Sequence, residues 1–182
     1  MRIIGGEARG RRLFAPEGLE TRPTADKVRE SLFNILRFET PGARVLDLFA
    51  GSGALALEAI SRGAQSAVLV DCSRKAADAI RRNIEACRAG ERTRLLTGDW
   101  RRAVEQLTEP FDLVFLDPPY RMTEVYALAA DLLHERGLLD REAVLVMEHA
   151  SGTALTLPDA FEIYDERVYG AAAVALVRRR EP

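Results

Sequence analysis

The most specific chemical motif in the sequence is Asp-Pro-Pro-Tyr at residues 117–120. Its two consecutive prolines, Pro118 and Pro119, fix φ, remove two N–H donors and bias Asp117 toward an extended backbone. Carbonyl groups that such a turn leaves unpaired can accept hydrogen bonds from an amine, and the ring of Tyr120 offers a flat face for a base. A rigid turn alone would explain the prolines but not the aspartate and tyrosine beside them. The motif therefore predicts a site for an amine carried by a planar base.

A second motif, Asp-Leu-Phe-Ala-Gly-Ser-Gly at residues 47–53, joins a predicted strand to a predicted helix. Its glycines allow a tight turn and a close approach of the backbone to a ligand just before a helix N-terminus. The motif is not a full dinucleotide fingerprint, because Leu55 and Ala56 follow Gly53, and it is not a P-loop, because no Gly-Lys-Ser/Thr follows. The carboxylate of Asp47 would repel a phosphate and attract a cation. Alone, the motif is a weak indication of a nucleoside site.

Two further aspartates follow predicted strands, and each has two interpretations. Asp71 lies 18 positions after Gly53 and could accept both hydroxyls of a ribose, or it could cap the next helix, for which Ser73 competes. Asp99 could accept a hydrogen bond from an adenine amine, with Trp100 packed nearby. For Asp99 alone, a helix cap is the simpler interpretation.

The elements that must position these residues alternate between strand and helix. Short Val- and Leu-rich runs at 44–49, 67–71, 93–97, 111–117 and 143–147 are separated by helical patterns at 54–62, 73–88, 100–107 and 123–136. Such alternation predicts βαβ units in one doubly wound, mostly parallel sheet, whose ligands lie at the carboxyl ends of the strands. Residues 161–168 and 172–178, linked at Gly170, predict an antiparallel pair at the sheet edge.

The first part of the chain predicts a different structure. Residues 2–4 and 11–14 flank Gly10 and predict a small hairpin, and Thr24 is a candidate N-cap for a helix that ends before residues 41–42. We expect a single domain over residues 1–182, in which residues 1–23 are a basic extension and residues 24–182 are the core.

Composition limits the classes of protein. The chain has 182 residues, a formal net charge of −2 and two cysteines, Cys72 and Cys87. These values disfavour a uniformly basic protein that coats nucleic acid, a disulfide framework and a four-ligand zinc site. The opening has no apolar signal segment and no run approaches the ~20 residues of a membrane span, so we expect a cytoplasmic protein with reduced thiols.

Positive charge is concentrated near the start of the chain. Residues 1–37 hold eight Lys/Arg and five Asp/Glu, which is +3, so the remainder carries −5. Arg9, Arg11 and Arg12 could contact phosphates, or they could be the solvated edge of an ordinary hairpin. A second run, residues 178–180, is interpreted as a solubilising tail.

Together these motifs resemble the S-adenosylmethionine-dependent amino-methyltransferases, in which Asp/Asn-Pro-Pro-Tyr/Phe marks enzymes that methylate exocyclic or amide nitrogens. Residues 1–13, 21–36 and 47–58 are similar to the RsmD-type 16S rRNA guanine-N2 methyltransferases. The resemblance covers essentially the whole chain, with the motifs in the family's order. Many relatives have Glu where this chain has Asp71, and the shorter carboxylate can still bind a ribose.

The resemblance implies a class I methyltransferase fold, which is a seven-stranded Rossmann-like sheet with an antiparallel last strand. It implies that residues 47–53 hold the methionine end of S-adenosylmethionine, that Asp71 binds the ribose and that Asp99 binds the adenine. The residues expected to bind the cofactor are Arg22, Thr24, Asp47, Phe49, Ala50, Gly51, Ser52, Gly53, Asp71, Cys72, Asp99 and Trp100. The substrate implied is a guanine of 16S rRNA, presented in the small ribosomal subunit.

The expected catalytic residues are Asp117, Pro118, Pro119 and Tyr120. Asp117 and the Pro118 carbonyl would accept the two N–H bonds of guanine N2, and Tyr120 would stack on a flipped base. The reaction needs no metal, and nothing in the sequence demands more than a monomer. The alternatives are a DNA amino-methyltransferase, a protein-glutamine methyltransferase, or a nucleoside- or RNA-binding module that is not an enzyme. A nicotinamide oxidoreductase is weaker, because the dinucleotide fingerprint is incomplete.

Overall fold

The computed structural model describes residues 1–16 and 23–180, and the side chains of residues 23–25 lie outside that description. Of the predicted site residues, Arg22 therefore lies outside the described residues, and Thr24 is placed only by its backbone within a helix. Among the described residues, no helix is both long and apolar enough to cross a membrane.

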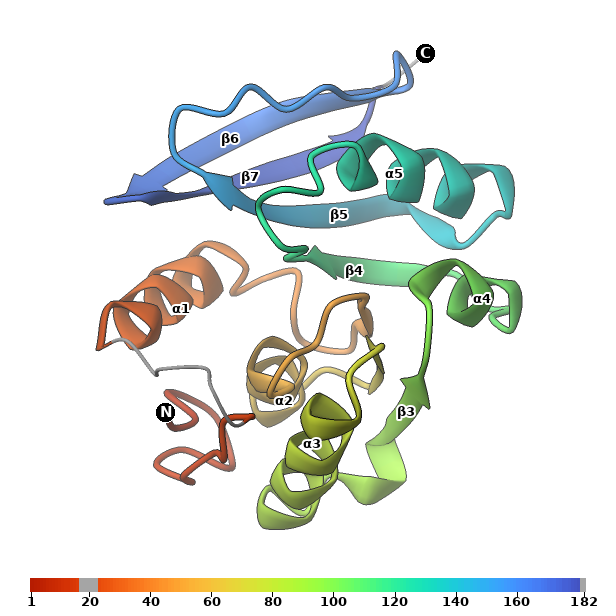
Figure 1. The fold of residues 1–182 in the computed structure, drawn as a ribbon. Helices are drawn as coiled ribbons and strands as arrows, with labels where there is room; N and C mark the ends of the chain where they lie inside the picture. Colours follow the sequence, from red (N-terminus) through yellow and green to blue (C-terminus); the bar gives the residue numbers. More distant parts are fainter. Residues whose placement is uncertain (17–22, 181–182) are drawn as a thin grey trace.

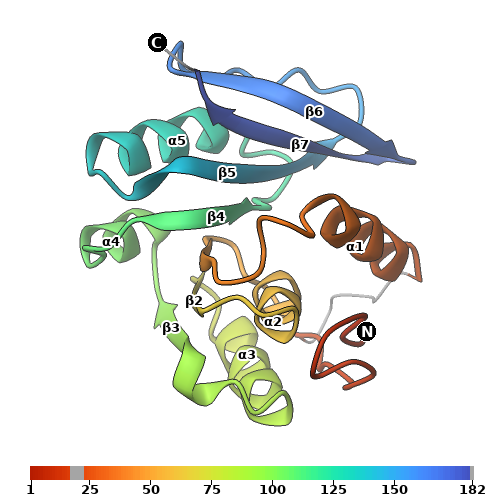
Figure 2. The same ribbon diagram turned by 180° about the vertical axis from the view of Figure 1, so that it is seen from behind.

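The centre of the fold is a seven-stranded sheet with the order β3-β2-β1-β4-β5-β7-β6 (Figures 1 and 2). Strand β7 runs antiparallel to both of its neighbours, β5 and β6, whereas the pairs from β3 to β5 are parallel. The predicted doubly wound sheet with an antiparallel last strand is confirmed. The strands are β1 (Arg44–Asp47), β2 (Ser66–Asp71), β3 (Thr93–Thr97), β4 (Phe111–Leu116), β5 (Leu139–Ala150), β6 (Phe161–Tyr169) and β7 (Ala172–Arg179).

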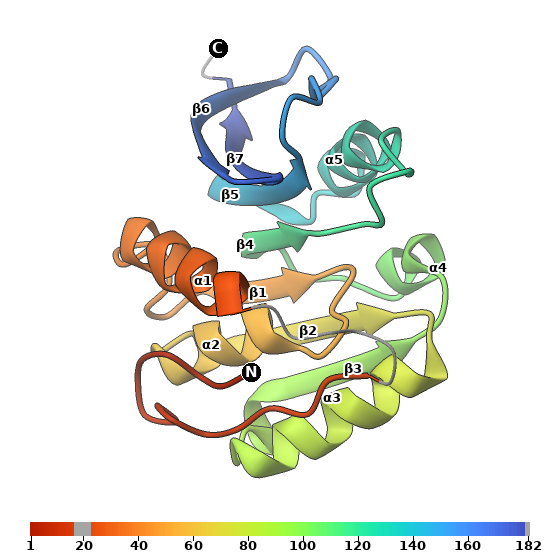
Figure 3. The same ribbon diagram turned by 60° about the vertical axis from the view of Figure 1, so that its left-hand side comes forward.

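In the described part of the chain, five α-helices cover the two faces of this sheet (Figure 3). They are α1 (Pro23–Ile35), α2 (Ala54–Ser61), α3 (Arg74–Ala86), α4 (Trp100–Glu105) and α5 (Val125–Glu135), with a short 3-10 turn at Gly90–Arg92. The predicted N-cap at Thr24 is wrong, because the helix already includes Pro23. Proline suits the first helical turn, since its fixed φ is helical and its missing N–H would have no intrahelical partner there.

Alternating side chains of the strands supply two apolar cores, one on each face of the sheet. Val45 of β1 packs in the core of α1, α2 and α3, together with residues such as Phe33 and Ile80. Its neighbour Leu46 packs on the other face with α4 and α5. Because both faces are buried, these strands read as continuous apolar runs rather than as alternating ones.

The N-terminal segment forms the predicted hairpin beside α2 and α3 (Figures 1 and 3). Its two arms meet at a single bridge between Arg2 and Arg12, supported by hydrogen bonds from Ile3 N to Arg11 O and from Leu13 N to Met1 O, at 2.9 and 3.0 Å. So short a pairing would be marginal by itself. Contacts with the helices must therefore stabilise it.

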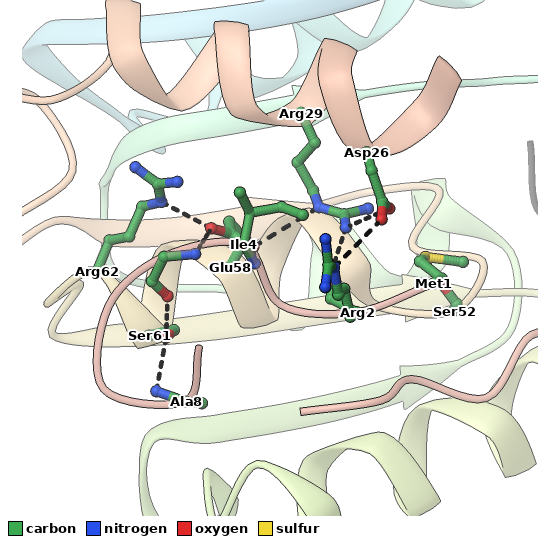
Figure 4. A network of polar contacts seen from close by, with 11 residues as sticks. Met1, Arg2, Ile4, Ala8, Asp26, Arg29, Ser52, Glu58, Ser61 and Arg62 are labelled. Carbon is green, nitrogen blue, oxygen red and sulfur yellow. Dashed lines mark hydrogen bonds and ion pairs between the residues drawn. The ribbon is translucent and has the colours of Figure 1, made fainter. Parts of the chain in front are cut away.

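Those contacts centre on Glu58 of α2, which is fully buried (Figure 4). Its carboxylate accepts hydrogen bonds from Ile4 N at 2.7 Å, Gly5 N at 2.8 Å and Arg62 Nε at 2.7 Å. Arg29 of α1 lies on the other side, with Nε 3.6 Å from Glu58 Oε2, and also donates to Arg2 O and Asp26. A buried charge is tolerated when it is paired and hydrogen-bonded, so this network joins the hairpin to α1 and α2.

The interpretation of residues 178–180 as a solubilising tail is wrong, since even Arg180 donates hydrogen bonds from its N to Ala160 O at 2.8 Å and from its Nε to Phe161 O at 3.0 Å. Arg178 and Arg179 belong to β7. Arg178 pairs with Glu162 of β6, and Arg179 donates a hydrogen bond to Asp140 O of β5, so both arginines tie the edge strands together.

Candidate active site

A cavity of about 580 Å³ lies at the carboxyl ends of β1, β4 and β5. Both sequence motifs reach it, because Asp47 ends β1 and Asp117 directly follows β4. The predicted site residues that line the cavity are Asp47, Phe49, Ala50, Gly51, Ser52, Asp117 and Tyr120. A different cavity, of about 680 Å³, is lined by Arg141, Tyr164 and Arg178 among others and includes none of the predicted site residues.

The glycine motif turns the chain from β1 into α2. Gly51 and Gly53 have φ values of 56° and 78°, in the left-handed region that glycine adopts without strain. A Cβ atom on Gly53 would also lie 2.9 Å from Leu69 Cδ2, whereas one on Gly51 would meet no atom within 4 Å. Glycine at position 53 therefore allows close packing, and glycine at position 51 leaves open space beside the cavity.

Asp47 is 1% exposed, and its Oδ1 atom has no hydrogen-bond partner among the described residues. Burial raises the pKa of Asp47 to about 7, although hydrogen bonds from the backbone of Phe49 and Ala56 lower it. A buried carboxylate with a free oxygen, in the wall of a cavity, suits a cationic ligand that would supply the missing partner.

Two more acidic side chains, Asp117 and Glu148, line the same cavity. Burial is the main cause that raises the pKa of Asp117 well above its ordinary value, and the charges of Glu148 and Asp47 add to it. Burial also raises the pKa of Glu148, whereas a hydrogen bond with the side chain of Tyr120 lowers it. The cavity is therefore an acidic environment in which a positive charge would be stabilised.

Glu148 was missed by the sequence analysis. It follows the apolar run at 143–147, so the rule that ligands lie at the carboxyl ends of strands could have identified it. Its backbone is held by Tyr126 of α5, whose hydroxyl donates a hydrogen bond to Glu148 O at 2.6 Å. The Tyr120 ring, which is 46% exposed, borders the cavity beside Glu148.

Asp71 and Asp99 lie at the ends of the neighbouring strands but do not line the cavity. Asp71 Oδ2 accepts a hydrogen bond from Gly51 N at 2.8 Å, so it supports the glycine turn. The helix cap of α3 is Ser73, so the capping interpretation of Asp71 is wrong. The capping interpretation of Asp99 is confirmed, because its Oδ1 accepts from Arg101 N and Arg102 N at 3.0 and 3.4 Å.

The remaining predicted residues are dispersed. Cys72 is exposed and Pro119 is exposed, whereas Pro118 and Trp100 are buried. None of these four lines the cavity. The Trp100 ring packs against Phe49, with ring centroids 6.4 Å apart, so it supports the glycine motif from behind.

Part of the cavity wall comes from segments that the sequence analysis did not assign to the site. Met1, Ala15 and Pro16 of the hairpin segment contribute, as do Arg29 of α1 and the turn at residues 169–172. No local pattern marks these residues, because only the packing of the hairpin and of the β6–β7 edge brings them there. No group of three or more histidine, cysteine, aspartate or glutamate side chains in the described part of the chain is arranged to hold a metal ion.

The family model described as "Conserved hypothetical protein 95" matches residues 1–178. The chain belongs to this family. Its relatives include Ribosomal RNA small subunit methyltransferase D of Escherichia coli (strain K12), which is 38% identical over 180 residues, or 98% of this chain and 90% of that protein. YlbH of Bacillus subtilis (strain 168) is 37% identical over 185 residues, or 99% of this chain and 100% of that protein.

Solved structures show the same architecture. The yhhF protein of Escherichia coli is 36% identical and has a TM-score of 0.86, with 98% of this chain and 97% of that chain covered. A methyltransferase of Podospora anserina solved with bound S-adenosylhomocysteine has a TM-score of 0.68 at 19% identity, over 88% of this chain and 83% of that one. This second likeness shows the fold alone, which is that of a class I methyltransferase.

Proposed function

We propose that this family member transfers a methyl group from S-adenosylmethionine to the exocyclic N2 of a guanine in small-subunit rRNA. The proposal rests on one observation: the glycine motif and the Asp-Pro-Pro-Tyr motif open into a single cavity, which three carboxylates of the described residues line. The relatives named as rRNA methyltransferases support the reaction class.

The cavity suits a cofactor that carries positive charge at both its sulfur and its amino group. The unpartnered Asp47 Oδ1 would accept a hydrogen bond from the amino group, and the backbone at residues 49–52 would surround the methionine end. When bound, the cofactor supplies an activated methyl group on a positively charged sulfur. Asp71, Asp99, Cys72 and Trp100 lie beyond the cavity wall, where we propose that they contact the ribose and adenine.

The contribution of the chain is positioning and charge stabilisation. Guanine N2 is a poor nucleophile because its lone pair is delocalised into the ring. The Asp117 carboxylate and the Pro118 carbonyl would accept its two N–H bonds and so direct the lone pair into the cavity. Tyr120, half-exposed at the cavity edge, would stack on the flipped base.

The Asp117 side chain is the better hydrogen-bond acceptor when it is ionised. In that form it also stabilises a nearby positive charge. Burial and its acidic neighbours raise its pKa, so the free protein favours the protonated form more than an exposed aspartate would. A cationic ligand in the same cavity acts in the opposite direction and favours ionisation. Asp117 therefore becomes most acidic when the cavity is filled.

Arg9, Arg11 and Arg12 are exposed on the hairpin, where they could contact RNA phosphates. We further propose that the substrate is the assembled small ribosomal subunit in the cytoplasm, that the protein acts as a monomer, and that no metal takes part.

The experiment is to incubate the purified protein with methyl-labelled S-adenosylmethionine and each of four acceptors. These are unmethylated small subunits, naked 16S rRNA, duplex DNA and a protein extract. The expected result is label in subunits or rRNA, recovered as N2-methylguanine. Label only in DNA or protein would overturn the substrate, and label in another nucleoside of rRNA would overturn the N2 assignment.

A further inference from the structure

The second arm of the N-terminal hairpin is fixed along helix α3, as Figure 3 shows. Asn83 of α3 is fully buried and makes two hydrogen bonds with the backbone of Phe14. Phe14 N donates to Asn83 Oδ1 at 2.7 Å, and Asn83 Nδ2 donates to Phe14 O at 2.8 Å. These two hydrogen bonds resemble those that a neighbouring β-strand makes with a backbone. They involve only backbone atoms of residue 14, so its backbone position does not depend on its side chain.

The same asparagine connects the arm to the cavity. Asn83 Nδ2 also donates to Ser52 O, in the glycine motif, at 2.8 Å. The next two residues of the arm, Ala15 and Pro16, line the cavity itself. The arm therefore leads along α3 and ends at the cavity where we propose that methyl transfer takes place.

The side chain of Phe14 is 43% exposed, although it is a large apolar ring. The guanidinium carbon of Arg82, on the exposed side of α3, lies 3.8 Å from the centre of that ring. An arginine and an aromatic ring in face contact form a flat surface with positive charge, which is what proteins use to stack nucleic-acid bases.

Positive charge continues along the arm. Arg11 and Arg12 lie three and two residues before Phe14 on this arm, and both are exposed. Within the described part of the chain, Arg11, Arg12 and Arg82 are not paired with a carboxylate. The nearby Arg81 and Arg92 are paired, with Asp78 and Glu7 respectively. Arginines without a carboxylate partner remain available to phosphates.

We propose that Phe14 and Arg82 form a stacking subsite for an unpaired RNA base that flanks the target guanine, with Arg11 and Arg12 on the adjoining phosphates. This inference rests on the proposed function. The partner is RNA rather than an acidic protein surface, because a half-exposed aromatic ring beneath a guanidinium offers a face to a base, whereas an acidic surface would need only the charges.

The test compares four variants with the wild type, and one of them, Arg11→Ala, removes a charge that we place on a phosphate. Phe14→Leu removes the aromatic face but keeps the backbone hydrogen bonds with Asn83, and Arg82→Ala removes the guanidinium. Arg81→Ala is the matched control, since Arg81 is the preceding residue on α3, exposed and paired with Asp78. The measurements are KM for small subunits, Kd for a single-stranded oligoribonucleotide as a function of salt, and Kd for S-adenosylmethionine.

We expect Phe14→Leu and Arg82→Ala each to weaken oligoribonucleotide binding by roughly 5- to 100-fold, at the scale of losing one stacked base. Phe14→Leu should leave the salt dependence unchanged, whereas Arg11→Ala should reduce the slope by about 0.7. Arg81→Ala and the Kd for S-adenosylmethionine should stay near wild type. If Phe14→Leu does not fold, Arg82→Ala at an exposed position still tests the subsite.

Equal RNA binding by Arg82→Ala, Arg81→Ala and the wild type would overturn the stacking subsite. A defect on subunits without one on the oligoribonucleotide would overturn RNA as the partner and indicate a ribosomal protein. In both cases wild-type methylation of subunits would leave the proposed function intact. Absence of wild-type methylation on every acceptor would instead count against the proposed function itself.

Discussion

Glu58 on α2 and Asp47 at the end of β1 are both almost fully enclosed, with exposed fractions of 0% and 1%. The carboxylate of Glu58 receives two backbone N–H groups and two arginines (Figure 4). Asp47 Oδ1 receives no hydrogen bond from the described residues, and burial raises the pKa of Asp47 to about 7. A buried acid that the protein pairs completely joins segments of the fold, whereas one that it leaves partly unpaired reduces stability and is available to a ligand.

The largest effect should come from the paired acid. Glu58→Gln removes the charge between Arg29 and Arg62, and we expect the free energy of unfolding to fall by about 3–5 kcal/mol, as when one partner of a buried ion pair is lost. Urea unfolding measures it, with Glu85→Gln on the exposed side of α3 as the control. A loss no greater than that of the control would mean that Glu58 does not hold the hairpin.

Asp47, which the protein leaves partly unpaired, should reduce the free energy of unfolding, in contrast to Glu58. Because the pKa of Asp47 is about 7 in the folded protein and 3.8 ordinarily, the folded state keeps its proton longer than the unfolded state. Asp47 therefore lowers stability as pH rises from about 4 to about 7, by up to about 4 kcal/mol, and this loss persists at higher pH.

Asp47→Asn should remove that dependence in the cofactor-free protein. We expect the variant to match the wild type at pH 4 and to be more stable at pH 8, while its Kd for S-adenosylmethionine rises. Urea unfolding at both pH values and a binding titration are the measurements. A variant that is less stable than the wild type at pH 8 would contradict the comparison between the two acids.

Replacing Asp117 tests whether the acidic side chains of the cavity contribute to the reaction. Asp117→Ala should reduce turnover by roughly 100-fold or more, at the scale of one electrostatic contact to the transition state, while cofactor binding persists. Turnover with labelled cofactor and a separate binding titration distinguish the two effects. Near-wild-type turnover would remove Asp117 from the mechanism.

The smallest effect concerns Glu148. Its negative charge contributes to the raised pKa of Asp117, so Glu148→Gln should lower that pKa. The acid limb of the pH profile of turnover should then move to lower pH. The titratable groups that also lie near this pair are Asp47, Tyr120, Tyr126 and His149. The profile is measured with saturating cofactor, so that the pH dependence of cofactor binding through Asp47 does not enter it. A lower rate at every pH with an unmoved acid limb would indicate that Glu148 acts only on packing.

Local pattern predicted most of the fold. The Val- and Leu-rich runs correspond to β1 through β5, and the Gly170 link corresponds to the antiparallel turn between β6 and β7. These predictions succeeded because strands buried on both faces need apolar residues throughout and tight turns need glycine, and both requirements are visible over a few residues. Thr24 failed as a cap because Pro23 also suits a helix start.

The sequence by itself determined the Asp47–Gly53 turn, the Asp-Pro-Pro-Tyr motif and the sheet edge at which they meet. Only the tertiary structure decided that Met1 and Pro16 line the cavity and that Asn83 fixes Phe14 beside it. The physical reason is the distance along the sequence between the residues that determine each property. Backbone conformation and strand burial depend on neighbouring residues, whereas the raised pKa of Asp117 and the pairing of Glu58 depend on groups that are brought together only when distant segments pack.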